Sequence, residues 1–459
     1  MLKANFGDFM KELDCIFNAK SVAVIGASRT PGKLGYEILK NIIDANYSGK
    51  LYPVNPKADE ILGLKAYKSV TEIPEPVDLA VIVIPARFVP DTVRECGKKG
   101  IRGIVVISGG FGEVGNKELE DDLVKAVKEY GIRMIGPNCQ GINNPKIGLN
   151  ASWPMIKAPG VISIASQSGT FFATLQMWAK DDNVGVSKCA ALGNKLDVDF
   201  DDLVEYYGAD PDTKVIAIYM EGVRNGKRFV DAARKVTKNK PVIVLKGGRT
   251  ELGARAVASH TRSLAGKDQI FDAAFIRSRI IRVQDLEELY DTAKAFATLP
   301  IPKGNRLLIV TSSGGSGILA TDEASERGLD VPLPSESLVN ILKEKVPDYV
   351  ILRNPLDLTG NAYSELYQIV LSEALKTDEY DAVVAIFGDP ISGAADLIGS
   401  IVKQSTIPIA IVYLGGGDVQ FEEKKKFESM GIPVYPTAER AVRALANMVK
   451  YSQLITKKQ

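Results

Sequence analysis

The chain has little cysteine, no excess of charge of either sign and no long apolar run, and each shortage excludes a class of protein. Its four cysteines (Cys15, Cys96, Cys139 and Cys189) are widely spaced with no CxxC pair, which argues against a disulfide framework or a zinc site. The formal net charge of +1 gives no electrostatic case for nucleic acid or an anionic membrane as a partner. No apolar run approaches the ~20 residues of a membrane span, and the first residues lack the order of a signal peptide. We therefore expect a cytoplasmic protein.

The length and the hydrophobic pattern predict several α/β domains. With 459 residues, 45% of them hydrophobic, the chain is long enough for roughly three domains with real cores. Short β-branched runs alternate with amphipathic stretches, which indicates βαβ units and parallel sheets. We expect an α/β chain of three consecutive doubly wound domains with mainly parallel sheets, near 1–135, 136–300 and 301–459, with a linker at 293–305. The strand-like runs lie at 21–26, 51–55, 79–85, 103–108, 133–138, 160–169, 186–192, 215–222, 241–248, 306–317, 382–389 and 407–416, and helix-like segments at 37–45, 90–99 and 117–130.

The first chemical motif is GASRTPGKLG, residues 26–35, which follows the first apolar run. Glycines there let the backbone approach a phosphate, and the next helix points its first amides at it. The spacing is not GxGxxG, and the second strand ends in VNPK (54–57), where a dinucleotide site would place an acid for the ribose. Instead, Arg29, Lys33 and Lys57 form a cationic group that suits a phosphate. A nicotinamide site, a plain tight turn and solvated lysines stay open as alternatives.

Two further glycine turns, SQSGT (166–170) and SSGGSG (312–317), each follow an apolar strand and precede a helix. Such a turn offers backbone amides, hydroxyl groups and the positive end of a helix dipole, all of which attract an anion. Either turn alone is as well explained as a plain turn. Two of them in separate domains suggest that both face one phosphate.

The only histidine, His260, lies in ASHTRSLAG (258–266). Its small polar neighbours are typical of an exposed mobile loop, whereas a structural histidine would need a packed core. Imidazole is nucleophilic near neutral pH and forms a labile phosphoramidate, so it can act as a phosphoryl relay. Such a relay needs a carboxylate to orient it, and Glu221, at the end of an apolar strand, is our candidate. A structural histidine and a solvated strand end are the alternatives.

Acidic residues crowd LGNKLDVDFDD, residues 192–202. They lack the spacing of a calcium-binding loop, so we favour a helix N-terminus over a metal site. Asn194, in the same stretch, is a candidate to bind an acyl or phosphate oxygen. Cys139, in GPNCQG, has no base beside it in the sequence, and we interpret it as small and buried.

Together these motifs resemble the succinyl-CoA synthetase superfamily, and within it the α subunits of ADP-forming acetyl-CoA synthetases, over essentially the whole chain. The resemblance implies a Rossmann-like CoA-binding domain followed by two flavodoxin-like ligase domains, with NPLDLTG (354–360) in the last. It implies catalytic roles for His260 and Glu221, and an acyl site at Asn194. It assigns phosphate binding to Ser166, Ser168, Gly169, Thr170, Ser312, Ser313, Gly314 and Gly315. It assigns CoA binding to Gly26, Ala27, Ser28, Arg29, Lys33, Gly35, Val54, Asn55, Lys57, Ile84, Pro85, Ala86, Ser108, Asn138 and Cys139.

The resemblance also implies the reaction and the partner. Acyl-CoA, phosphate and ADP would give the carboxylic acid, CoA and ATP through an acyl phosphate and a phosphorylated His260. We find no ATP-grasp module in this sequence, so a separate β subunit would supply the ADP/ATP site with Mg²⁺ in an α2β2 assembly, and no metal ligand is placed in this chain. A non-catalytic CoA-binding regulatory protein is the first rival, and a nicotinamide-dependent oxidoreductase the second.

Overall fold

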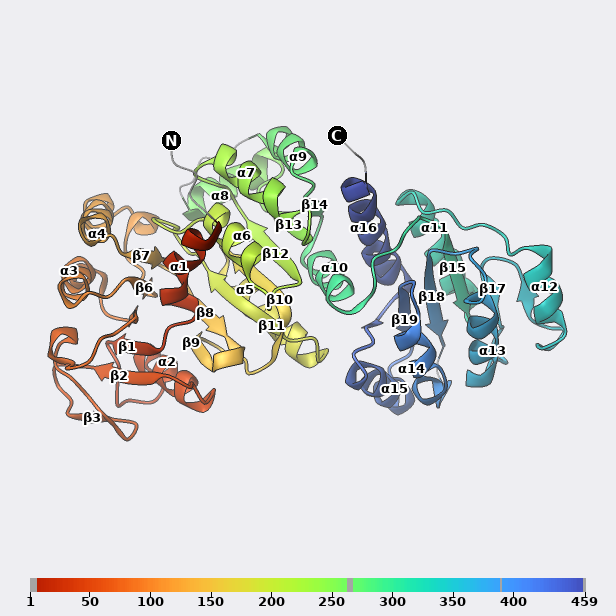
Figure 1. The fold of residues 1–459 in the computed structure, drawn as a ribbon, viewed down its shortest axis with the longest axis horizontal. Coiled ribbons are helices and arrows are strands. Elements are labelled where there is room, and N and C mark those ends of the chain that lie inside the picture. Colours follow the sequence, from red (N-terminus) through yellow and green to blue (C-terminus); the bar gives the residue numbers. More distant parts are fainter. Residues whose placement is uncertain (1–5, 262–266, 389, 457–459) are drawn as a thin grey trace. The chain divides into compact units, whose positions relative to one another are not determined.

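The computed structural model describes residues 6–261, 267–388 and 390–456, and of residues 6–11 and 259–261 it describes the backbone only. These residues form three mainly parallel sheets with helices between the strands (Figure 1), which confirms the predicted α/β fold. The chain divides into two compact units, Met1–Lys180 with Gly185–Val283 and Asp181–Val184 with Gln284–Gln459. The first unit contains two of the sheets. The three predicted domain boundaries stay a prediction.

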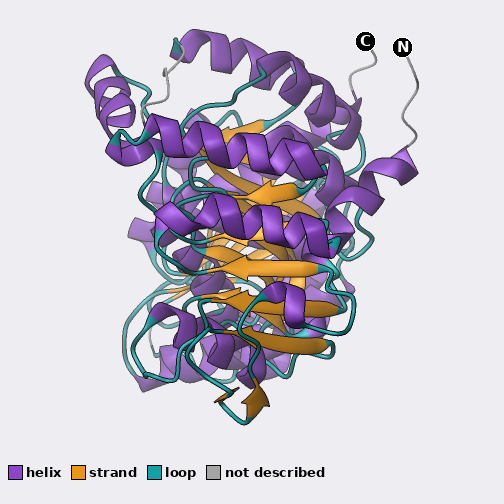
Figure 2. Ribbon diagram, turned by 90° about the vertical axis from the view of Figure 1, so that its left-hand side faces the viewer, coloured by secondary structure: helices purple, strands orange, loops and turns teal. Residues whose placement is uncertain are grey.

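The first sheet has the strand order β2–β1–β5–β6–β7, and all its strands are parallel. Its strands are β-branched and aliphatic runs, most of them buried along their whole length, as the two covered faces of a parallel sheet require. Figure 2 shows helices lying across strands on the side turned to the viewer. The bounds are β1 (Ser21–Ile25), β2 (Lys50–Val54), β5 (Leu79–Ile82), β6 (Gly103–Val106), β7 (Arg133–Ile135), α1 (Phe6–Phe17), α2 (Leu34–Asp44), α3 (Val89–Lys99) and α4 (Lys117–Tyr130), with a small hairpin of β3 (Glu60–Ile61) and β4 (Leu64–Lys65).

The second sheet has the order β14–β13–β12–β10–β11–β8–β9. Five of these strands are parallel, and the hairpin β8–β9 adds an antiparallel edge beside β11. The bounds are β8 (Gly141–Asn144), β9 (Leu149–Ser152), β10 (Pro159–Ser166), β11 (Val186–Ala191), β12 (Val215–Met220), β13 (Val242–Lys246), β14 (Ile281–Val283), α5 (Gly169–Asp181), α6 (Phe200–Ala209), α7 (Gly226–Val236), α8 (Glu251–Thr261) and α9 (Asp268–Arg277).

The third sheet, in the second unit, has the order β16–β17–β15–β18–β19–β20. Only β16 runs antiparallel to its neighbour. The bounds are β15 (Leu307–Thr311), β16 (Ile351–Leu352), β17 (Leu356–Asp357), β18 (Ala382–Phe387), β19 (Ile409–Tyr413), β20 (Val434–Tyr435), α10 (Leu286–Thr298), α11 (Gly314–Glu326), α12 (Glu336–Lys343), α13 (Ser364–Ala374), α14 (Ala394–Gln404), α15 (Asp418–Ser429) and α16 (Ala438–Thr456).

The three sheets share one arrangement of their parallel strands. In each, the first strand lies between the second and the third, so the strand order reverses beside it: between β1 and β5, between β10 and β12, and between β15 and β18. Open α/β sheets bind their ligands at such a switch point, beyond the carboxyl ends of the strands. Each glycine-rich turn singled out in the sequence follows one of these first strands, so the fold places all three turns at switch points.

Two predictions about the backbone are wrong. The segment 293–305 is not a linker throughout, because α10 continues to Thr298. Ala293, Ala295 and Phe296 are buried there, and the apolar area that they remove from water stabilises a helix across the predicted boundary. His260 does not lie in an open loop either, because α8 includes residues 251–261. The sequence ELGARAVAS before it has good helix formers, and residues 262–266 lie outside the described residues.

Strands end earlier than their apolar runs predict. β5 ends at Ile82 and not at residue 85, and β7 ends at Ile135 and not at residue 138. In both cases the run continues into residues that turn out of the sheet at its carboxyl edge. Among the helices of residues 6–261, 267–388 and 390–456, none has the length and apolar character needed to cross a membrane.

Candidate functional site

The turn after β10 and the end of β12 are joined by one side chain. The hydroxyl of Ser166 donates to the carbonyl oxygen of Ser168 at 2.7 Å and accepts from its backbone N–H at 3.1 Å, which closes the turn. The side-chain oxygen of Gln167, which is buried, accepts from the backbone N–H of Glu221 at 2.7 Å and of Gly222 at 3.1 Å. The start of α5 and the glutamate predicted to be catalytic are therefore held side by side.

The carboxylate of Glu221 is almost completely buried, with 4% of the residue exposed. Tyr219, two residues earlier and so on the same face of β12, donates its phenol O–H to Glu221 Oε1 at 3.3 Å. Lys246 ends the neighbouring strand β13 directly beside Met220, and it is also buried. Burial lowers the pKa of Lys246, and its ammonium group lies 4.7 Å from the centre of the Phe271 ring. This edge therefore carries buried groups of both charges.

The chain leads from this edge into α8, the helix that carries His260. β13 ends at Lys246, beside the end of β12, and the chain passes through Gly247 and Gly248 into α8. Gly248 has a φ of +73°, a left-handed conformation that suits glycine in the turn between strand and helix. His260 lies in the last turn of α8, and its side chain is outside the described residues. The pairing of His260 with Glu221 therefore stays a prediction.

The turn after β15 repeats the hydrogen bonds that close the first turn. The hydroxyl of Thr311 donates to the carbonyl oxygen of Ser313 and accepts from its backbone N–H, both at 2.9 Å. The hydroxyl of Ser312 accepts from the backbone N–H of Gly388 at 2.8 Å, as Gln167 does from Glu221. In the strand registers, Thr311 pairs with Ile386 as Ser166 pairs with Tyr219. Gly388 therefore stands where the second sheet has Glu221.

Both turns place the first amides of a helix at the switch point. α5 begins at Gly169 and α11 at Gly314. The first four N–H groups of a helix have no partner within it, and the dipole adds about half a positive charge there. The hydroxyls of Ser166 and Ser312 are used inside the protein, so an anion would be met mainly by the backbone amides of Gly169, Thr170, Gly314 and Gly315. The structure places the predicted phosphate residues of each turn together, within their own units.

The residues predicted to bind CoA lie along the carboxyl edge of the first sheet. They follow β1, β2, β5, β6 and β7, the five strands of that sheet. The turn after β1 depends on two glycines. Gly26 has a φ of +92°, and a Cβ on Gly35 would lie closer than 3.0 Å to the carbonyl oxygen of Gly26, so α2 starts in direct contact with the turn. This is the close approach of backbone to helix that phosphate-binding turns use.

The cationic group predicted from the sequence is exposed at this edge. Arg29, Lys33 and Lys57 are all exposed to solvent. The side chain of Asn55 donates to the carbonyl oxygen of Ala27 at 2.7 Å, which fixes the end of β2 to the turn after β1. No acidic side chain occupies residues 54–57, so the ribose contact of a dinucleotide site has no residue there.

Other predicted CoA residues serve to shape the edge. The hydroxyl of Ser108 donates to the carbonyl oxygen of Ile84 at 2.6 Å and accepts from its backbone N–H at 3.1 Å. Cys139 is buried, its thiol donates to the carbonyl oxygen of Val106 at 3.3 Å, and burial raises its pKa to about 12. These properties support the interpretation of Cys139 as a small buried residue rather than a nucleophile.

Asn194 connects the first two sheets. Its amide donates to Glu113 Oε2 at 2.6 Å, and its oxygen accepts from Asn138 at 3.3 Å. Burial alone would raise the pKa of Glu113, but hydrogen bonds from the backbone of Gly110 and from Asn194 hold it below its usual value. The predicted acyl residue is thus anchored beside Asn138, a predicted CoA residue.

Asp199, Asp201 and Asp202 form a helix start, as we favoured, whereas Asp197 accepts hydrogen bonds from Arg133 and the backbone N–H of Met134. Asp199 caps α6 and makes a capping box with Asp202. The guanidinium group of Arg228 lies 2.9 Å from Asp201 and 3.2 Å from Asp202. Burial and the neighbouring carboxylate of Asp202 raise the pKa of Asp201 to about 6. These contacts explain the acids through the stability of α6.

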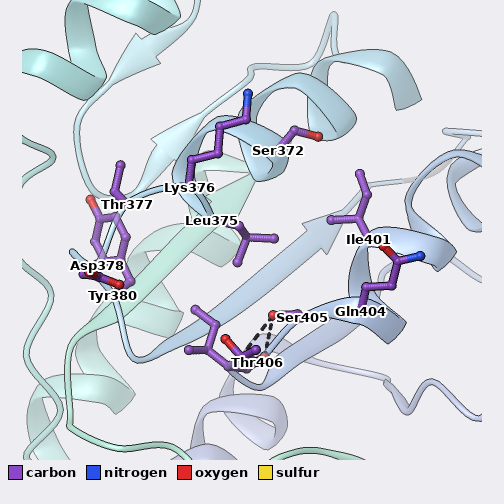
Figure 3. Close-up of a pocket in the computed structure, with 11 residues that line it drawn as sticks. Ser372, Leu375, Lys376, Thr377, Asp378, Tyr380, Ile401, Gln404, Ser405 and Thr406 are labelled. Atoms are coloured by element: carbon purple, nitrogen blue, oxygen red, sulfur yellow. Dashed lines mark hydrogen bonds between the residues drawn. The ribbon is translucent and has the colours of Figure 1, made fainter.

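A surface pocket of about 410 Å³ in the second unit lies away from these turns. Its lining, which includes Leu375, Tyr380 and Ile407, belongs to the segments that precede β18 and β19 (Figure 3). It therefore opens at the amino edge of the third sheet, opposite to the turn after β15. None of the predicted residues lines it.

Our sequence interpretation missed three residues that shape the site. Gln167 lies inside the SQSGT motif between two chosen serines, and only its burial reveals it as the link to Glu221. Tyr219 could have been found from the two-residue spacing between it and Glu221 at the end of the apolar run. Glu113 is 81 residues from Asn194 in the sequence, and no local pattern connects them.

Family models match two regions of the chain. Residues 20–145 match a CoA binding domain, and residues 159–296 match a succinyl-CoA ligase like flavodoxin domain. These regions contain the first sheet and the parallel strands of the second.

Relatives match nearly the whole chain. It is 42% identical to acetate–CoA ligase [ADP-forming] I subunit alpha of Pyrococcus furiosus, with 96% of this chain and 98% of the relative covered. It is also 42% identical to acetate–CoA ligase [ADP-forming] of Methanocaldococcus jannaschii, with 97% of this chain but only 64% of the relative covered. Among solved structures, the dinucleotide forming acetyl-coenzyme A synthetase 1 of Ca. Korarchaeum cryptofilum, in complex with phosphate and ADP, matches with a TM-score of 0.91, 38% identity and 97% of each chain.

Proposed function

Since this chain belongs to the family of ADP-forming acetate–CoA ligase α subunits, we propose that it carries a phosphoryl group from an acyl-CoA site to a nucleotide on His260. The overall reaction converts acyl-CoA, phosphate and ADP into the carboxylic acid, CoA and ATP. One observation supports the assignment above all: Gln167 ties the start of α5 to Glu221 at the switch point of the second sheet. An anion-binding helix start and a buried carboxylate are thereby fixed at one edge, and α8, which carries His260, follows the neighbouring strand.

The first step takes place where the first two sheets meet. A phosphate oxygen attacks the thioester carbonyl carbon, the C–S bond breaks, and CoA leaves as a thiol after taking up a proton. The edge of the first sheet holds CoA, with its phosphates near the turn at Gly26–Gly35 and the exposed cations Arg29, Lys33 and Lys57. Asn194, fixed by Glu113, lies beside Asn138 and hydrogen-bonds the acyl phosphate oxygen.

In the second step, the imidazole of His260 attacks phosphorus. The P–O bond to the acyl group breaks, and the carboxylate leaves. Glu221 orients the imidazole by accepting its other N–H and stabilises the positive charge that develops. The amides at the start of α5 stabilise the phosphoryl oxygens by fixed dipoles, so catalysis is positioning and electrostatics. The start of α11, in the second unit, offers amides that can bind a phosphate in the same way.

In the third step, a β-phosphate oxygen of ADP attacks the phosphoryl group and the N–P bond breaks. The chain is an α subunit and works with a separate partner subunit. We propose that this partner is an ATP-grasp β subunit that holds the nucleotide with Mg²⁺ in an α2β2 assembly. The Methanocaldococcus jannaschii relative, of which this chain covers 64%, has additional length that is consistent with a fused nucleotide module.

The test is phosphoryl labelling of the complex of this chain with its partner subunit. Incubation with acyl-CoA and labelled phosphate, or with labelled ATP, should give an acid-labile, base-stable label on His260. His260→Ala should remove it, and Glu221→Gln should slow labelling by about 100-fold while CoA binding is unchanged. Glu373→Gln, a glutamate on α13 with 9% exposure, is the control and should label normally.

Two outcomes would decide against the proposal. If His260→Ala labels and turns over like the parent, the relay is wrong. If the parent binds CoA but takes no label from either donor, the chain is a CoA-binding regulatory protein.

A further inference from the structure

Tyr219, near the end of β12, contacts the carboxylate of Glu221, which directly follows that strand. Its phenol O–H donates to Glu221 Oε1 at 3.3 Å. Burial, with the neighbouring carboxylate of Glu221, raises the pKa of Tyr219, so the phenol keeps its proton and stays a donor at neutral pH.

The ring of Tyr219 is itself held in place by the phosphate-binding helix. It packs edge-to-face against Phe171, with ring centres 4.6 Å apart and an angle of 73° between the rings. Phe171 lies in the first turn of α5, directly after Thr170. An aromatic pair of this geometry restricts both rings. Tyr219 therefore links the orientation of the carboxylate to the start of α5.

The end of β13 leaves room for the phenol. A Cβ on Gly247 would lie 2.8 Å from the phenol oxygen of Tyr219 but 3.4 Å from ring atom Cζ. The first distance is shorter than real Cβ contacts, and the second is ordinary contact. Gly247 thus leaves space for the hydroxyl of Tyr219. If residue 219 were phenylalanine, which lacks this hydroxyl, an alanine at residue 247 would fit.

We propose that Tyr219 is a positioning residue for phosphoryl transfer, which holds the Glu221 carboxylate towards His260 and couples its orientation to α5 through Phe171. It does not touch the reacting atoms. The inference rests on the proposed function of Glu221 and His260. Residues that orient a catalytic group usually change activity by about 10- to 100-fold when they are removed.

The first experiment is Tyr219→Phe in the complex with the partner subunit. It removes the hydroxyl but keeps the ring against Phe171, so the fold is preserved. We expect kcat and the rate of labelling of His260 to fall about tenfold, with KM for CoA and phosphate within about twofold of the parent. The control is Tyr207→Phe, which removes a tyrosine O–H that donates at 3.3 Å to the carbonyl oxygen of Ile164, inside the same sheet. Its kcat should be unchanged.

A second pair of variants distinguishes positioning from packing. Gly247→Ala should displace the phenol and lower kcat about as much as Tyr219→Phe does. In the double variant Tyr219→Phe with Gly247→Ala, the second change should add no further loss, because the clashing oxygen is gone. A general packing defect would instead make the two losses multiply, and that result would overturn the inference.

The outcomes separate this inference from the proposed function. If Glu221→Gln slows labelling by about 100-fold while Tyr219→Phe keeps kcat within twofold of the parent, Tyr219 does not position the carboxylate and the relay stands. If Glu221→Gln labels like the parent, the role of Glu221 fails and the inference fails with it.

Discussion

Replacing Gly35 by alanine tests whether the turn after β1 binds CoA. The added Cβ would lie closer than 3.0 Å to the carbonyl oxygen of Gly26, whereas ordinary contact begins at 3.4 Å. Both partners belong to the backbone, so no side chain can rotate away, and the start of α2 must move by about 1 Å, a displacement that can change the function of a site by about 100-fold. We expect KM for CoA to rise tenfold or more. The free energy of unfolding should fall by about 1–3 kcal/mol, which is the usual cost of inserting an extra methyl group into a packed region.

The assay compares two reactions of the same complex. Overall turnover requires CoA, whereas labelling of His260 from ATP does not, so Gly35→Ala should impair only the first. Gly226→Ala is the control, because its Cβ meets nothing closer than 4.0 Å at the start of another helix. An unchanged KM for CoA in a variant with reduced stability would show that this turn does not hold CoA. Equal loss of both reactions would show that the variant has lost its fold.

Three further predictions concern charges. Lys188→Met should lower the free energy of unfolding by about 3–5 kcal/mol in denaturant titrations, because Lys188 and Asp210 form a buried ion pair at 2.8 Å and the substitution removes the cation. The hydroxyls of Ser187 and Thr213 still donate to Asp210 but carry no charge, and a loss below 1 kcal/mol would contradict the prediction. Burial raises the pKa of Glu428 from 4.5 to about 7, so between these pH values the folded protein keeps a proton that the unfolded chain has released, and stability falls as the pH rises. Glu428→Gln should therefore raise the free energy of unfolding by up to about 3 kcal/mol at pH 8 and by little at pH 4. An equal effect at both pH values would show that protonation of Glu428 is not the cause. Arg29→Ala and Lys57→Ala should each raise KM for CoA and make KM depend less on the salt concentration. If the salt dependence of KM stays as in the parent, these two cations do not contribute to CoA binding.

Much of the fold could be predicted because its signals are local. Continuous apolar runs followed by glycine turns indicate the first parallel strand of each sheet. Because parallel strands all end at the same edge, the residues that follow them lie together there. That is why the residues assigned to CoA, although spread from Gly26 to Cys139, lie along one edge. The acids of residues 199–202 were also interpretable, since capping is a contact between near neighbours in the sequence.

The rest depended on contacts that no local pattern contains. The helix that crosses the expected linker at 293–298 is stabilised by burial in the second unit, which only the folded chain reveals. The loop expected around His260 depended on small polar residues, but alanine and leucine before it favour a helix up to Thr261. The roles of Gln167 and Glu113 come from partners 54 and 81 residues away.

The repeated turn distinguishes the second sheet from the third as the place for the proposed phosphoryl transfer. The turns after β10 and β15 have the same internal hydrogen bonds, and in each the second residue binds the backbone at the end of the third parallel strand. Their ability to meet an anion with helix amides is therefore equivalent. The turns differ in side chains, with Ser166 and Gln167 in one and Thr311 and Ser312 in the other. The strand ends differ as well, because one carries the carboxylate of Glu221 and the other carries Gly388, which has no side chain. For the proposed relay, the second sheet has both a helix start that can hold a phosphate and a carboxylate that can orient an imidazole, whereas the third sheet has only the helix start.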